Sequence, residues 1–210
     1  MAERAHPDDI AFKDKWFGLK RNRYRARLFE RYRFCNRYVR DMHVADVPCG
    51  TGWGTSMLKG YAHVHGIDIS DEAVSFANHR FAIPDKRIFS QGSMDALPFT
   101  DSSKNVVICL EGFEHVSQEI GKGFLLEAKR VLEPDGLLIM TCPVLNTEYK
   151  HTGNPYHIYE YPEEELIGLL NDHFRVELLE RIKGPDGPEY RTVLSNFKPQ
   201  RYTVSEEIEG

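Results

Sequence analysis

Two kinds of segment alternate along the chain. Short apolar runs typical of buried strands occur at 43–47, 62–69, 86–91, 105–112, 137–143, 175–182 and 191–197. Between them, apolar residues recur at helical spacing, as Ile120, Phe124, Ala128 and Val131 do. Strands that alternate with helices predict a parallel sheet covered on both faces. We therefore expect an α/β fold with a seven-stranded, mostly parallel sheet and helices at about 55–58, 70–80, 117–132 and 161–174.

Capping residues support the longer helices. Ser70 precedes two acids and is a favoured N-cap residue. Pro162 stands at the first turn of the last helix, where proline is tolerated, and three glutamates follow it.

Composition narrows the classes of protein only modestly. The 210 residues suffice for one domain, and the net charge of −5 argues against general affinity for nucleic acid or membranes. No apolar run approaches the roughly 20 residues that span a bilayer, and the first thirty residues are too charged for a secretory signal. The four cysteines are scattered without a CxxC pair, so we expect reduced thiols in the cytoplasm and no zinc.

Charge is concentrated near the N-terminus, where residues 21–40 hold eight arginines. The favoured interpretation is a helix that packs on the domain through Leu28, Tyr32, Cys35 and Val39, with its arginines in water. Alternatively, the segment forms a lid whose arginines bind an anionic group of a ligand, or its Arg and Tyr side chains stack on single-stranded RNA. We divide the chain into an Arg-rich extension at 1–42, a main domain at 43–198 and an acidic, flexible tail at 199–210.

The stretch "VADVPCGTGWGT", residues 44–55, places three glycines just after a predicted strand. A dinucleotide fingerprint would need Gly or Ala at Thr55, and Trp53 would crowd a pyrophosphate. No GK[ST] follows, which excludes a Walker loop. Asp46 at the strand end favours a ligand that carries a cation and no phosphate. S-adenosylmethionine (SAM), which has an ammonium, a sulfonium and a ribose, fits this description.

The sequence resembles the class I SAM-dependent methyltransferases, especially their small-molecule subgroup, over residues 43–182. The resemblance rests on five ordered segments: "DVPCGTGWG", "GIDIS", "QGSMDALPF", "CLEGFEHV" and "EAKRVLEPDGLLIMTCP". It implies a Rossmann-like fold and a catalytic methyltransferase domain in which SAM is the cofactor.

The resemblance also implies roles for individual residues. Asp46 would reach the methionine amino group through water, and Asp68 would accept both ribose hydroxyls. Ile69 would pack on the adenine, whose edge the Met94 backbone and Asp95 would recognise. The remaining expected cofactor contacts are Gly50, Thr51, Gly52, Leu110 and Glu111.

Two positions depart from the family pattern. Pro48 replaces the first family glycine, so its turn must accept a φ near −65°. Lys104–Asn105 replaces the usual aromatic–Asp pair, which is a structural feature of the family.

His115 is the first candidate for a catalytic base, because it follows the fourth strand, where the transferred methyl is expected. The alternative is a histidine that caps the helix beginning near Ser117. The spacing of Glu111, Glu114, His115 and the later His157 is also similar to the divalent-metal set of small-RNA 3′-end 2′-O-methyltransferases. Metal-free small-molecule methyltransferases share much of this pattern, so we expect no metal and assign His157 to the acceptor pocket as a second catalytic residue.

The segment "NTEYKHTGNPYHIYEYP" lies where the family carries a substrate cap, and its aromatic and polar side chains suit a sugar or polyol. We predict O-methylation of a sugar, a glycan intermediate or another small hydroxyl metabolite, without a membrane partner. A metal-assisted RNA-end methyltransferase and a SAM-binding module without catalysis remain as alternatives, and a homodimer stays open.

Overall fold

The computed structural model describes residues 26, 28–145, 153–183 and 188–196. Most of the predicted extension at 1–42 and the whole predicted tail at 199–210 lie outside these residues.

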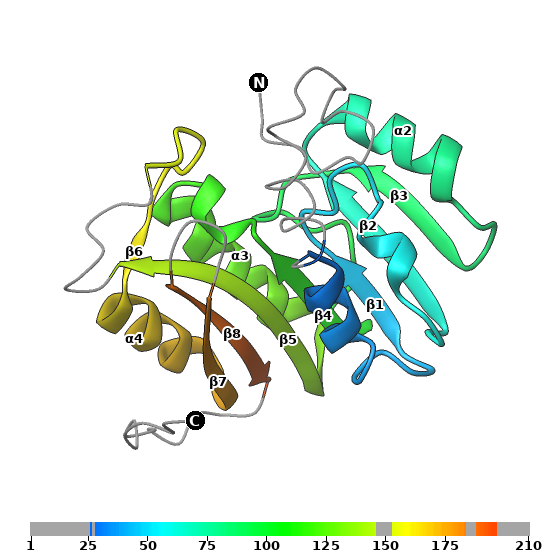
Figure 1. Cartoon of the computed structure of the whole chain (residues 1–210). Coiled ribbons are helices and arrows are strands. Elements are labelled where there is room, and N and C mark those ends of the chain that lie inside the picture. The colour runs from blue at the N-terminus through cyan, green and yellow to red at the C-terminus, as the bar shows by residue number, and fades with distance from the viewer. Residues whose placement is uncertain (1–25, 27, 146–152, 184–187, 197–210) are drawn as a thin grey trace.

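One mixed sheet forms the centre of the molecule (Figure 1). Its strands are β1 (His43–Asp46), β2 (His63–Asp68), β3 (Arg87–Gln91), β4 (Lys104–Leu110), β5 (Leu132–Leu145), β6 (Tyr161–Pro162), β7 (Arg175–Lys183) and β8 (Pro188–Ser195). The order is β3-β2-β1-β4-β5-β8-β7, and β6 pairs separately with β5. All pairs are parallel except those that β8 makes with β5 and β7. The predicted fold class is confirmed, with the two-residue β6 as an eighth strand.

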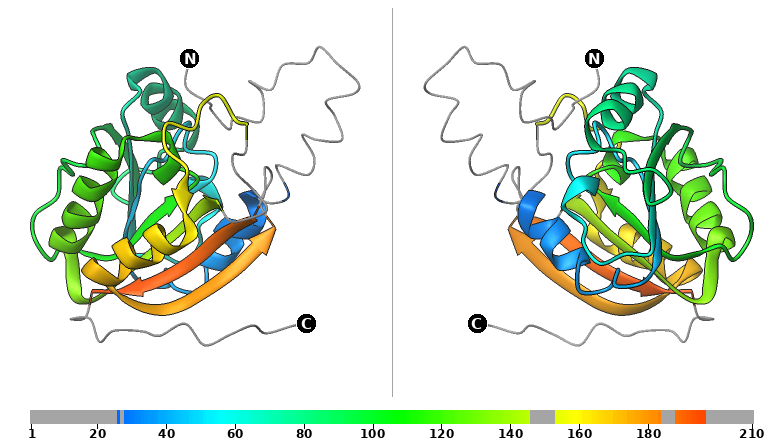
Figure 2. Two further views of the ribbon diagram at one scale, coloured as in Figure 1. Left: turned by 90° about the vertical axis from the view of Figure 1, so that its left-hand side faces the viewer. Right: turned by 90° about the vertical axis from the view of Figure 1, so that its right-hand side faces the viewer.

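Helices cover both faces of this sheet, as the two side views in Figure 2 show. They are α2 (Asp71–Phe81), α3 (Gln118–Val131) and α4 (Glu163–His173), together with the 3-10 turns η1 (Thr55–Met57) and η2 (Phe113–His115). The Ser70 side chain accepts a hydrogen bond from Ala73 N at 3.2 Å and caps α2 as predicted. The short helix predicted at 55–58 is only one 3-10 turn, because the chain is already extended at Leu58.

The two faces divide the hydrophobic core. On one face, α3 and α4 pack against Val107, Cys109 and Leu138. On the other face, Val106 and Ile108 contact the helical residues 28–35, which we call the N-terminal helix.

The N-terminal helix packs as its apolar stripe predicts. Leu28, Tyr32 and Cys35 of this helix are buried, as is Val39 beyond it. The prediction that its arginines lie in water is wrong for Arg31, of which only 3% is exposed.

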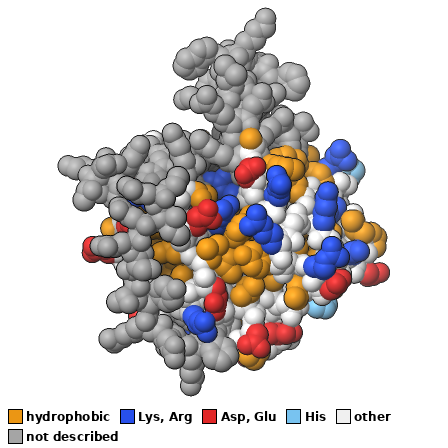
Figure 3. Space-filling model, turned by 60° about the horizontal axis from the view of Figure 1, so that its bottom comes forward, with side chains coloured by type: hydrophobic (Ala, Val, Ile, Leu, Met, Phe, Trp, Pro, Cys, Tyr) orange, Lys and Arg blue, Asp and Glu red, His pale blue; other side chains and the backbone are white. Residues whose placement is uncertain are grey.

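Charges of both signs are interspersed with hydrophobic side chains on the face drawn in Figure 3. Among the described helices, none has the length and apolar character needed to cross a membrane.

Candidate active site

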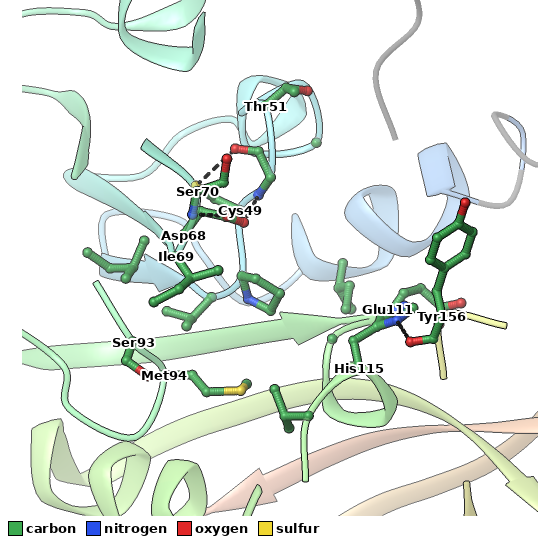
Figure 4. A pocket seen from close by; sticks show the side chains of 18 of the residues that line it. Cys49, Thr51, Asp68, Ile69, Ser70, Ser93, Met94, Glu111, His115 and Tyr156 are labelled. Carbon is green, nitrogen blue, oxygen red and sulfur yellow. Dashed lines mark hydrogen bonds between the residues drawn. The ribbon is translucent and has the colours of Figure 1, made fainter. Parts of the chain in front are cut away.

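A cavity of about 690 Å³ opens at the carboxyl ends of β1, β2 and β4 (Figure 4). Strand order reverses between β1 and β4, and parallel α/β sheets bind ligands at such a switch point. In the close-up, Asp68, Ile69, Ser93 and Met94 lie at one end, and Glu111, His115 and Tyr156 lie at the other. The cavity therefore has two chemically different ends.

Asp68 stands at the first end, on the last residue of β2. Its Oδ2 accepts a hydrogen bond from Gly50 N at 2.8 Å, and its Oδ1 accepts one from Ser70 N at 2.9 Å. These bonds fix the carboxylate and leave lone pairs for a ligand, since an ionised carboxylate offers about four acceptor sites. Gly50 lies in the left-handed region with φ 54°, which brings its bare backbone to the cavity wall.

Thr51 contributes a buried hydroxyl beside the cavity. Its side chain lines the cavity, and the buried Oγ1 has no hydrogen-bond partner among the described residues. A buried polar group without a partner is costly, so a ligand that bonds this hydroxyl is favoured. Ile69 and Met94 add apolar walls at the same end. A fixed carboxylate, an unpartnered hydroxyl and an apolar slot fit the ribose and adenine of SAM.

Asp46 lies away from the cavity wall, unlike Asp68, Gly50 and Thr51. It is fully buried and is not among the described residues that line the cavity. Its Oδ2 accepts hydrogen bonds from Thr55 Oγ1 at 2.6 Å and from the Tyr32 hydroxyl at 3.0 Å. Burial raises the pKa of this carboxyl to about 7, although both hydroxyls act to lower it. The predicted water-mediated contact with the methionine amino group stays a prediction.

Two further predicted residues, Gly52 and Asp95, are not among the described residues that line the cavity. A Cβ on Gly52 would lie 2.7 Å from the Ala77 Cβ, so this glycine allows α2 to pack closely. Asp95 accepts a short hydrogen bond from Ser93 and lies against Gly123 of α3. Their proposed cofactor contacts remain untested.

Leu110 and Glu111 line the cavity where β4 ends. Glu111 has a φ of 52°, and its carboxylate bonds Thr141 Oγ1 at 2.7 Å and Arg31 Nη2 at 3.2 Å. The sequence interpretation missed this role of Arg31. The signal was present, because Arg31 lies at helical spacing from the buried Leu28 and Cys35.

His115 lines the second end of the cavity. Its Nδ1 donates a hydrogen bond to the Tyr156 carbonyl at 3.0 Å, and its Nε2 lies 4.0 Å from Glu114 Oε1. The interpretation of His115 as a helix cap is wrong, because Ser117 caps α3 by accepting from Ile120 N at 3.3 Å.

His157 comes close to His115 from a different loop. Their ring centroids are 5.1 Å apart in an edge-on arrangement, although His157 is not among the described cavity-lining residues. Possible metal-ligating atoms of Glu114, His115 and His157 all lie within 4.8 Å of one another. Glu111 is not part of this group, so three of the four predicted ligands converge.

Comparisons with known proteins agree with this geometry. A family model described as a methyltransferase domain matches residues 45–140. A probable SAM-dependent methyltransferase of Mycolicibacterium smegmatis is 30% identical over 131 residues, which are 60% of this chain and 49% of that protein. A phthiotriol/phenolphthiotriol dimycocerosates methyltransferase of Mycobacterium ulcerans is 34% identical over 104 residues, 47% of this chain and 36% of that protein.

Among solved structures, a putative methyltransferase in complex with the Haloferax volcanii Trm112 activator aligns with a TM-score of 0.70 at 18% identity. The alignment covers 89% of this chain and 100% of the matched chain. The protein spans about half the length of the first curated relative it matches. Together with the cavity at the switch point, these matches show that the chain carries a class I SAM-dependent methyltransferase domain.

Proposed function

We propose that the protein transfers a methyl group from SAM to a hydroxyl of a small metabolite, with His115 as the general base. The position of His115 carries this proposal. Its imidazole lies at the cavity wall, at the end opposite Asp68, and a hydrogen bond to the Tyr156 carbonyl holds it in one orientation.

The hydrogen bonds of His115 decide which of its nitrogens is basic. The Tyr156 carbonyl can only accept, so Nδ1 carries the proton and Nε2 is the basic nitrogen of the neutral ring. Glu114 is 1% exposed and lies close to Nε2, where its carboxylate would stabilise the imidazolium formed by proton uptake.

Asp68, Thr51 and Ile69 would hold the nucleoside of SAM, which supplies an activated methyl group when it is bound. The chain then has to orient the acceptor, exclude water and remove the hydroxyl proton. His115 meets the last requirement from the cavity wall.

The acceptor end combines few polar groups with an apolar rim. Leu28, Pro155, Tyr156 and Ile158 line it, and 65% of Ile158 is exposed. A sugar could stack one apolar face on these side chains, and a hydroxylated lipid could lie along them. The Mycobacterium ulcerans relative, whose name refers to phthiotriol dimycocerosates, supports including a lipid-like acceptor. The four cysteines are buried and form no disulfide among the described residues, which supports a reducing, cytoplasmic setting.

The test is SAH release from SAM with glucose, UDP-glucose, catechol and 1,2-decanediol as separate acceptors. With an acceptor that is turned over, His115→Ala should lower kcat by about 10²–10⁴ while SAH affinity stays within twofold. Unchanged turnover would remove His115 from the chemistry. SAH binding without turnover of any acceptor would favour the non-catalytic module.

A second candidate is the metal-assisted RNA-end methyltransferase, which the convergence of Glu114, His115 and His157 favours. In that case EDTA should abolish activity, Mn²⁺ should restore it, and RNA binding should weaken steeply with salt. The hydrogen bonds that already hold both imidazoles support the metal-free proposal.

A further inference from the structure

A buried histidine–carboxylate pair lies close to His115, outside the described residues that line the cavity. His157 Nδ1 is 2.6 Å from Glu160 Oε1, and the two side chains are 6% and 5% exposed. Glu160 directly precedes β6, which pairs with β5. The next residue, Tyr161, is fully buried and stacks on Phe113 at 5.0 Å between ring centroids. The Glu160 backbone is therefore anchored to the sheet.

The loop before Glu160 is tied to the turn that carries His115. Ile158 N and Tyr159 N both donate to the Glu114 carbonyl, at 2.9 and 3.2 Å. The loop and η2 therefore support each other through backbone hydrogen bonds as well as through the bond between His115 and Tyr156.

The direction of the side-chain hydrogen bonds follows from one fixed donor. Tyr156 N can only donate, and it bonds Asn154 Oδ1 at 3.0 Å. Asn154 therefore turns its Nδ2 toward His157 Nε2, 3.1 Å away, and Nε2 must accept. His157 thus carries its proton on Nδ1 and donates it to Glu160. The carboxylate is the acceptor that this tautomer requires.

We infer that Glu160 is a positioning residue, which acts through His157 and Asn154 to hold the Tyr156 carbonyl against His115 Nδ1. By fixing that carbonyl, Glu160 selects the His115 tautomer in which Nε2 is the basic nitrogen. The inference rests on the proposed function only for its catalytic meaning, because the tautomer itself is a property of the folded chain.

The experiment is ¹⁵N NMR of histidine-labelled protein saturated with SAH at about pH 8.5, where an ordinary imidazole is neutral. His115→Ala identifies the His115 signals. Native protein should show one His115 tautomer, protonated at Nδ1. Glu160→Leu, which keeps the size but removes the acceptor, should convert this signal into a mixture of tautomers. Glu160→Gln should retain the single tautomer, since its amide oxygen can still accept from His157.

Glu165→Leu is the matched control. Glu165 is a nearby carboxylate that bonds Tyr159 and Gln118 rather than His157. The control should keep the native His115 signal. A mixture in the control as well would show that any loosening of the region has this effect, and would overturn the inference.

A single Nδ1-protonated tautomer in Glu160→Leu would also overturn it. If that variant does not fold, Asn154→Ala interrupts the same series of hydrogen bonds between His157 and Tyr156. It should give the same mixture of tautomers, and an unchanged His115 signal would refute the inference. Failure of the proposed function is distinguishable, because it appears as full turnover in His115→Ala with the tautomer results unaffected.

Discussion

Replacing Asp46 by asparagine should change how the stability of the protein depends on pH. The carboxyl is fully buried, and burial raises its pKa from 3.8 to about 7. The unfolded chain therefore releases this proton at lower pH than the native protein, so ionisation of Asp46 favours unfolding. Native stability should fall as the pH rises from about 4 to about 7 and should then level off.

The size of the effect follows from the shift. Three pKa units at about 1.36 kcal/mol per unit amount to about 4 kcal/mol over the whole range. Between pH 5 and pH 8, the native protein should lose about 3 kcal/mol relative to Asp46→Asn. The amide has the same shape, and its oxygen can still accept from Thr55 and Tyr32.

The assay is urea unfolding of both proteins at pH 5, 6, 7 and 8, compared as the difference in unfolding free energy at each pH. Groups that titrate equally in both proteins cancel in this difference. Asp135→Asn, at an exposed position, should give a difference that varies by less than about 0.5 kcal/mol. A flat difference for Asp46→Asn as well would show that the buried carboxyl has an ordinary pKa.

Three further substitutions test the cavity and its supports. Asp68→Ala should weaken SAH binding, measured by calorimetry, by about 1.5–3 kcal/mol because it removes the acceptor for the ribose hydroxyls; native affinity would contradict the cradle. Gly54→Ala should destabilise the protein by about 1–3 kcal/mol in urea unfolding, since the new Cβ would lie 2.1 Å from the Tyr32 ring, and a neutral result would mean that the ring moves freely. Ser117→Ala should lower thermal stability by about 1 kcal/mol through loss of the α3 cap, whereas loss of SAH binding without a change in stability would be unexpected.

The strands could be predicted because short apolar runs of this kind are typical of buried strands. In β4, Val106 and Ile108 face one layer of helices while Val107 and Cys109 face the other, so a continuous apolar run indicates a central strand. The two-residue β6 carries no such pattern. The helix predicted after the glycine motif is only one 3-10 turn, because the backbone is already extended at Leu58.

The end of the cavity around Asp68 could be predicted from the sequence better than the end around His115. Asp68 and Gly50 belong to local motifs with fixed spacing, and the structure brings them together. The pairs Arg31–Glu111 and Tyr32–Asp46 join distant segments. The apolar stripe of the N-terminal helix predicts which side of the helix faces the core. It does not predict which carboxylates Arg31 and Tyr32 contact.

The family match at residues 45–140 divides the cavity wall into two parts. The walls around the nucleoside end lie inside that range, whereas Leu28 and Tyr32 precede it and Pro155, Tyr156 and Ile158 follow it. Beyond its own residues, the segment at 153–160 makes its described backbone hydrogen bonds to Glu114 rather than to Asp68 or Gly50. Grafting the segment at 153–160 onto a relative is therefore a direct test of whether this loop determines which acceptor is methylated.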